Sequence, residues 1–103
     1  MVPFIGYYAF VNIYDVEISR NALKDLRKFP RPILDKLQSW IEAIEIEGLQ
    51  DVRKLSGFHD EPLKGKRKGQ RSIRLNRSYR AIYTIQGDKL KFIFIEEVNN
   101  HDY

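Results

Sequence analysis

An apolar stripe at helical spacing constrains the fold of this chain more than any other feature. Between positions 33 and 44, apolar side chains recur every three or four residues, which is the period of one helix face. These residues are Ile33, Leu34, Leu37, Trp40, Ile41 and Ile44. Pro32 can open this helix, and Gly48 can end it after about Glu47. Because such a stripe must be buried, Trp40 is expected in the core and the helix needs a sheet to cover.

A strand and a shorter helix precede this helix. Apolar and charged residues alternate over positions 14–18, which is the period of a half-buried strand. Ser19 then fits the N-cap of a short helix that carries Leu23 and Leu26 on one face. Prolines at positions 30 and 32 end that helix, because proline lacks an amide donor and restricts the residue before it. The two helices are therefore expected to form a helical hairpin.

Three strands are expected in the second half of the chain, at 70–75, 79–86 and 89–97, after an irregular stretch from about 49 to 69. The last strand contains LKFIFIEE, whose centre is apolar on both faces, as in a central strand. Gly87 and Asp88 fit a two-residue hairpin turn before it. The order β-α-α-β-β-β predicts an α+β fold with two N-terminal helices packed on a mainly antiparallel four-stranded sheet.

Length and composition limit the possible classes of protein. The 103 residues suffice for one domain, residues 1–103, with one core. The apolar segment 1–13 is too short to span a bilayer and lacks a basic start, so it is expected to lead into the first strand, and no membrane association is predicted. Because the chain has no cysteine, disulfides and cysteine-based zinc sites are excluded, and a reducing cytoplasm is compatible.

Positive charge is concentrated in one segment, PLKGKRKGQRSIRLNRSYR, at positions 62–80. It holds eight cations and no anion, whereas the whole chain has a net charge of +4, so the rest of the chain carries −4. A local basic stripe is the usual footprint of a protein that binds polyanions. Four interpretations are open for it: a solvated loop, a nuclear address, a grip on nucleic acid, and the cationic half of an active site.

Strand alternation and glycine spacing sort these cations. Arg74 is expected on the sheet face opposite its apolar neighbours. Arg80, on the next strand, has two possible roles. It could hold a phosphate together with Arg74 by bidentate hydrogen bonds, or it could pair with a buried carboxylate such as Glu96 or Glu97.

The remaining cations surround a turn framed by two glycines. That turn is expected to expose Lys66, Arg67 and Lys68 to solvent. Together with Arg71 and Arg77, these residues would form a steering rim that positions a phosphate backbone without reading bases. The spacing differs from that of a nucleotide-binding P-loop, and the strand that should precede such a loop is missing.

Three residues with proton chemistry follow the last predicted strand: His101, Asp102 and Tyr103. Cleavage of RNA by its own 2′-hydroxyl requires a base for that proton, cations for the crowded phosphate, and an acid for the leaving oxygen. The basic segment and these three residues would together supply those groups. The other histidine, His59, is expected to be a loop residue.

The segment LKGKRKGQRSIRLNRSYRAIY, the element order and the terminus EVNNHDY resemble the RelE/ParE superfamily of type II toxin–antitoxin toxins, with the HigB-like branch nearest. The resemblance covers roughly residues 14–103. It implies a small RelE-like fold and a cytoplasmic endoribonuclease that needs no metal or cofactor. Such an enzyme cuts mRNA in the ribosomal A site and is neutralised by a cognate antitoxin.

The resemblance also implies a set of catalytic residues. By position in the motifs, they are Lys64, Arg74, Arg80, His101, Asp102 and Tyr103. The terminal order His-Asp-Tyr departs from relatives in which histidine follows the aspartate–tyrosine pair, so the assignment of base and acid stays open. Two alternatives remain on the same fold: a ParE-like inhibitor of DNA gyrase, and a non-catalytic domain that binds RNA or the ribosome.

Overall fold

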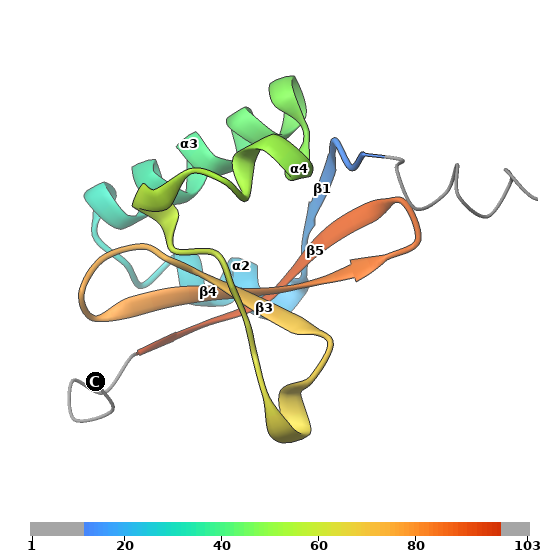
Figure 1. Ribbon diagram of the computed structural model, residues 1–103. Coiled ribbons are helices and arrows are strands. Elements are labelled where there is room, and N and C mark those ends of the chain that lie inside the picture. The colour runs from blue at the N-terminus through green and yellow to red at the C-terminus, as the bar shows by residue number, and fades with distance from the viewer. Residues whose placement is uncertain (1–11, 98–103) are drawn as a thin grey trace, which may run out of the picture.

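The computed structural model describes residues 12–97, in which helices pack against a twisted sheet (Figure 1). The strands are β1 Asp15–Ile18, β2 Glu61–Pro62, β3 Gln70–Arg74, β4 Tyr79–Gln86 and β5 Lys89–Glu97. The α-helices are α2 Arg20–Leu26, α3 Arg31–Glu47 and α4 Leu49–Val52, and two 3₁₀-helices are η1 Ser56–Phe58 and η2 Gly65–Arg67. The α+β class is confirmed.

The sheet has the strand order β1-β5-β4-β3-β2. β1 runs parallel to β5, and the other neighbouring pairs are antiparallel, so a mainly antiparallel sheet with β5 in its interior is confirmed. The predicted strand number was wrong, since the described residues form five strands rather than four. The extra strand, β2, is two residues long and gives no detectable alternation. The helix α4 was also missed, because it is a single turn inside the segment predicted to be irregular.

The predicted ends of the main elements are largely confirmed. Ser19 caps α2, because its Oγ accepts a hydrogen bond from the amide of Ala22 at 3.1 Å. The same hydroxyl donates to the carbonyl of Ile93 in β5 at 2.7 Å, which ties the start of α2 to the sheet. At the end of α3, Gly48 has a φ of +88°. A Cβ at that position would lie 2.2 Å from Nδ2 of Asn12, so glycine is required by both backbone conformation and space.

The hydrophobic core lies between the helices and one face of the sheet (Figure 1). Trp40 of α3 is fully buried, as predicted, and its ring centroid lies 5.4 Å from those of Tyr83 and Phe92 on the two central strands. These aromatic contacts fix α3 over β4 and β5.

The opposite face of the sheet carries a different set of side chains. Successive residues of a strand point to opposite faces, and Ile73, Ala81 and Ile95 belong to the core. Their neighbours therefore lie on the other side, which we call the turn face because η2 and its turn extend below it (Figure 1). The turn face is defined by Arg74 of β3, Arg80 and Ile82 of β4, and Phe94 and Glu96 of β5.

Candidate functional site

Two arginines lie opposite each other on the turn face. Arg74 of β3 and Arg80 of β4 are direct cross-strand partners. The neighbours of Arg74, Ile73 and Leu75, are 0% and 3% exposed, which confirms that Arg74 is on the face away from the core. Facing residues on adjacent antiparallel strands have Cβ atoms about 5 Å apart, so both guanidinium groups can reach one phosphate.

Glu96 lies beside Arg80 on the next strand and joins it to the basic turn. Arg80 Nε donates to Glu96 Oε2 at 2.5 Å, which confirms the alternative in which Arg80 pairs with a carboxylate of β5. Arg67 of η2 donates to the same carboxylate through both terminal nitrogens, with Nη1 3.2 Å from Oε2 and Nη2 2.9 Å from Oε1. Burial raises the pKa of Glu96, but hydrogen bonds and charges from Arg67 and Arg80 outweigh it and lower that pKa.

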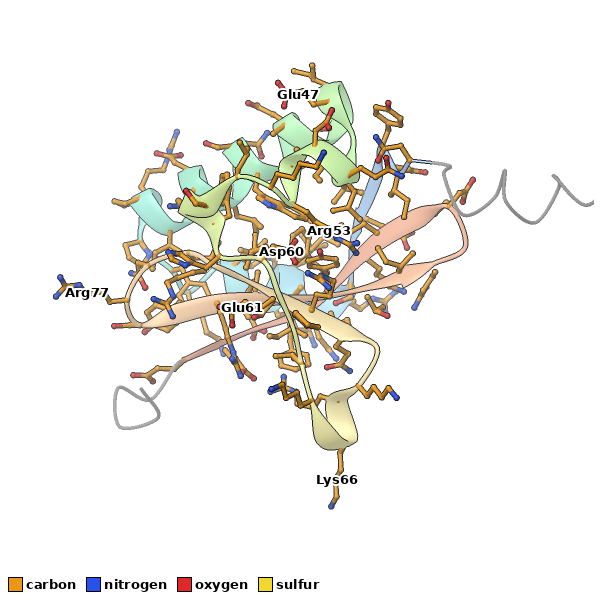
Figure 2. The ribbon with its side chains drawn as sticks, in the orientation of Figure 1. Glu47, Arg53, Asp60, Glu61, Lys66 and Arg77 are labelled. Atoms are coloured by element: carbon orange, nitrogen blue, oxygen red, sulfur yellow. The ribbon has the colours of Figure 1, made fainter. Side chains whose placement is uncertain are left out.

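The basic turn differs from the prediction at one residue. Lys66 and Lys68 are exposed as predicted, and Figure 2 shows Lys66 pointing away from the sheet. The prediction was wrong for Arg67, whose side chain is only 34% exposed. Besides its contact with Glu96, its guanidinium lies 5.1 Å from the ring centre of Phe94. Lys64, just before η2, is exposed.

Arg71 lies on the side of the sheet opposite the turn face and pairs there with Asp60. It shares strand parity with Ile73 and therefore faces the helix side. Its Nε donates at 2.6 Å to Asp60, whose side chain is 0% exposed, and the hydroxyl of Tyr83 donates to the other oxygen of Asp60 at 2.5 Å. Burial, together with the charge of Asp60 and the hydrogen bond to it, raises the pKa of Tyr83. This buried cluster fastens the segment before β2 to the sheet through Asp60, which is labelled in Figure 2.

Arg71 therefore does not belong with the exposed cations of the predicted rim. Arg77 does: it is exposed in the loop between β3 and β4 and points away from the sheet (Figure 2). Asn76 shapes that loop, because its Oδ1 accepts hydrogen bonds from the amides of Ser78 and Tyr79 at 2.8 Å each. Whether any rim cation contacts RNA stays a prediction.

The predicted proton-transfer residues His101, Asp102 and Tyr103 lie outside the described residues. His59 is described, and it is an exposed loop residue in the left-handed conformation, with a φ of 48°. In the described range 12–97, no group of three or more His, Asp or Glu side chains is placed to hold a metal ion. No helix in that range is long and apolar enough to cross a membrane.

The residues brought together on the turn face are Arg67, Arg74, Arg80 and Glu96, and their neighbours Ile82 and Phe94 form an apolar floor. Two cations on adjacent strands and a third from a turn can bind and stabilise a phosphate. The one carboxylate among these residues, Glu96, is already paired with Arg67 and Arg80, and none of these residues is suited to be the acid for the leaving oxygen. Glu96 was predicted only as an alternative partner of Arg80. Its second contact, with Arg67, was missed because the turn was expected to be fully solvated.

Comparison with known proteins gives matches to solved structures only. No protein-family model and no curated protein sequence matches the chain. The archaeal RelE–RelB complex from Pyrococcus horikoshii OT3 matches with a TM-score of 0.66 and 21% identity, over 84% of this chain and 97% of that chain. YafQ from E. coli strain BL21(DE3) matches with a TM-score of 0.64 and 21% identity, over 81% and 91%. The toxin–antitoxin complex RelBE2 from Mycobacterium tuberculosis matches with a TM-score of 0.54 and 20% identity, over 86% and 94%. At these identities, the comparison establishes a shared fold.

Proposed function

Because this chain has the fold of the RelE/ParE-like toxins, we propose that it is the toxin of a type II toxin–antitoxin system and acts as a ribosome-dependent mRNA endonuclease. The proposed substrate is mRNA in the ribosomal A site, and the LKG, SIR and YR segments resemble those of the HigB-like branch. The reaction is attack of the 2′-hydroxyl on the adjacent phosphate, which leaves a 2′,3′-cyclic phosphate and requires no metal or cofactor.

The observation that carries this proposal is the cross-strand pair of Arg74 and Arg80 on a face that also receives the basic turn. Phosphate cleavage passes through a species with extra negative charge, which positioned guanidinium groups stabilise more strongly than they stabilise the bound substrate. Lys64, the exposed residue just before η2, would add a compact charge to this phosphate site. Lys66, Lys68 and Arg77 steer the RNA backbone from the rim.

Proton transfer is assigned to residues that follow β5 directly in the sequence. β5 ends at Glu97, one residue after Glu96, the cross-strand partner of Arg80, and three residues of sequence separate Glu97 from His101. In the proposed mechanism, His101 and Asp102 handle the protons of the 2′-hydroxyl and of the leaving oxygen. Tyr103 stacks on a base or orients the 2′-hydroxyl.

A protein antitoxin is the proposed partner in addition to the ribosome and mRNA, and the cytoplasm is the proposed location. The RelE–RelB and RelBE2 structures are complexes with such a partner, which supports this assignment for a chain of the same fold. An antitoxin segment with acidic side chains would complement the exposed cations of the turn and rim.

The test is to incubate purified protein with ribosomes and a labelled mRNA and to map the product ends by primer extension. We expect cuts at the A-site codon with a 2′,3′-cyclic phosphate. His101→Ala should lose activity, and His59→Ala, which removes the only other histidine, should keep it. Intact mRNA with wild-type protein would refute the proposed function. Inhibition of gyrase supercoiling in that case would favour the ParE-like alternative, and salt-dependent RNA binding alone would favour the binding domain.

A further inference from the structure

One carboxylate on the turn face connects two arginines from different parts of the fold. Glu96 accepts hydrogen bonds from Arg80 on the neighbouring strand and from Arg67 in η2, and both of its oxygens are used. The side chains of Glu96, Arg80 and Arg67 are 24%, 30% and 34% exposed, so the cluster is partly buried but still accessible to solvent. Beneath it, Arg67 packs over the ring of Phe94.

This arrangement limits the freedom of both guanidinium groups. A guanidinium has five N–H donors in a fixed plane, and contact with Glu96 uses two donors of Arg67 and the Nε donor of Arg80. Arg80 Nη2 also contacts the same carboxylate oxygen. The remaining donors of each arginine then point in directions set by the carboxylate, which is how a neighbouring residue fixes the geometry of a group that binds substrate.

The carboxylate also changes the charge offered to a polyanion. Two guanidinium groups and one carboxylate carry a net charge of +1 rather than +2. A residue that only increased RNA affinity would not be an anion, because a carboxylate repels phosphate. Fixed geometry favours the transition state, whereas lower charge weakens binding of the substrate, so the two effects act on different kinetic constants.

We propose that Glu96 is a positioning residue that holds Arg67 and Arg80 in the geometry needed at the scissile phosphate, at the expense of RNA affinity. This inference rests on the proposed function. Glu96 itself does not contact the RNA in this proposal. It acts through the two arginines, and it makes Arg67 part of the site rather than part of the steering rim.

The experiment compares Glu96→Gln, Glu96→Asp and the matched control Glu97→Gln. Glu97 is an exposed neighbour with no ion pair to any residue in the range 12–97, so its replacement removes the same charge one position away without freeing an arginine. We would measure kcat and KM for mRNA cleavage on ribosomes. Binding to 2′-O-methyl RNA of the same sequence, which lacks the attacking hydroxyl, would be measured over a series of salt concentrations.

We expect Glu96→Gln to bind this RNA more tightly, with a salt slope steeper by about 0.7 for one added phosphate contact, and to have a kcat lower by about tenfold or more. Glu96→Asp keeps the negative charge, but its side chain is one methylene shorter, so the carboxylate lies farther from Arg67 and Arg80. We therefore expect kcat to fall and the salt slope to stay that of the wild type. Glu97→Gln should keep a wild-type kcat.

A kcat of Glu96→Asp equal to that of the wild type would overturn the positioning role. So would a parallel loss of RNA binding and of the cooperative thermal transition in both Glu96 variants, since that is the behaviour of a purely structural ion pair. Failure of the proposed function is seen separately, because it would appear as an inactive wild-type protein. In that case, the hydrogen bond between Arg80 and Glu96 is tested by the chemical shift of Arg80 Nε–H in a ¹⁵N spectrum. This resonance should shift in Glu96→Asp and should stay unchanged in Glu97→Gln.

Discussion

Replacement of Asp60 by alanine should be the most damaging single substitution of a charged residue in the described part of the chain. The Asp60 carboxylate is 0% exposed and accepts hydrogen bonds from Arg71 Nε at 2.6 Å and from the Tyr83 hydroxyl at 2.5 Å. In Asp60→Ala, Arg71 Nε and the Tyr83 hydroxyl lose their acceptor, and Arg71 keeps the 3.5 Å contact of Nη2 with the backbone carbonyl of residue 60. Tyr83 is 0% exposed and cannot recover a hydrogen bond from bulk water.

The expected loss in the free energy of unfolding can be worked from these contacts. Breaking a fully buried ion pair costs about 3–5 kcal/mol, but the Arg71 side chain is 25% exposed and regains part of its hydration. The hydrogen bond of Tyr83 contributes about 1–2 kcal/mol. We therefore expect a loss of about 3 kcal/mol, a large part of the roughly 5–15 kcal/mol available to a small domain. For a chain of this length, that corresponds to a decrease in Tm of about 12–24 °C.

The assay is urea unfolding followed by the fluorescence of Trp40, the only tryptophan, which is fully buried. Tyr83→Phe should lose about 1 kcal/mol, and the double variant Asp60→Ala/Tyr83→Phe should lose less than the sum of the two single variants. Asp51→Ala, whose carboxylate is 65% exposed, serves as the control and should change stability by less than about 0.5 kcal/mol. A loss below about 1 kcal/mol in Asp60→Ala would refute the reasoning.

Three further predictions concern pH, helix capping and RNA binding. The pKa of Tyr83 is raised in the folded state above its ordinary value of 10.0. The contribution of the protonated Tyr83 hydroxyl to stability is therefore complete below pH 10.0 and is lost as the pH rises above 10.0. In urea titrations above pH 10.0, Tyr83→Phe should lose less stability than the wild type loses. Ser19→Ala removes the hydroxyl that caps α2 and donates to β5, and should lower the free energy of unfolding by about 1–2 kcal/mol in the same assay, whereas an unchanged value would contradict the cap. Lys66→Ala should reduce the salt slope of RNA binding by about 0.7 without changing Tm, while Lys54→Ala, on the helix side, should leave the slope unchanged; equal slopes for both variants would remove Lys66 from the rim.

The long elements of the fold could be predicted because their sequence patterns extend over several periods. The boundaries of β4 and β5 and the end of α3 at Glu47 agree with the structure. By contrast, β2 and α4 contain two and four residues, which is only about one period of the strand pattern and of the helix pattern, respectively. Such short elements are determined by tertiary contacts, which no local sequence pattern reports.

The candidate site was predictable only where strand parity applied. Parity placed Arg74 on the turn face, and it could also have placed Arg71 on the opposite face, because both are counted from Ile73. Arg67 lies in a turn where no parity exists, and its contact with Glu96 joins positions 29 apart in the sequence. The segment around Asp60 has the composition of a solvated loop, so the full burial of this carboxylate could not be predicted from composition.

The place of β5 in the sheet has a consequence for synthesis of the chain. β5 is the last of the described strands to be translated, yet it pairs with both β1 and β4. Residue 15 of β1 therefore cannot pair with the sheet until residue 89 has been made. At translation rates of about 5–20 residues per second, the apolar side chains of α3 remain without their sheet for several seconds. A nascent chain that ends before position 96 also lacks Glu96, the partner of Arg67 and Arg80. Until β5 is made, the apolar face of α3 is therefore a surface that a chaperone can bind.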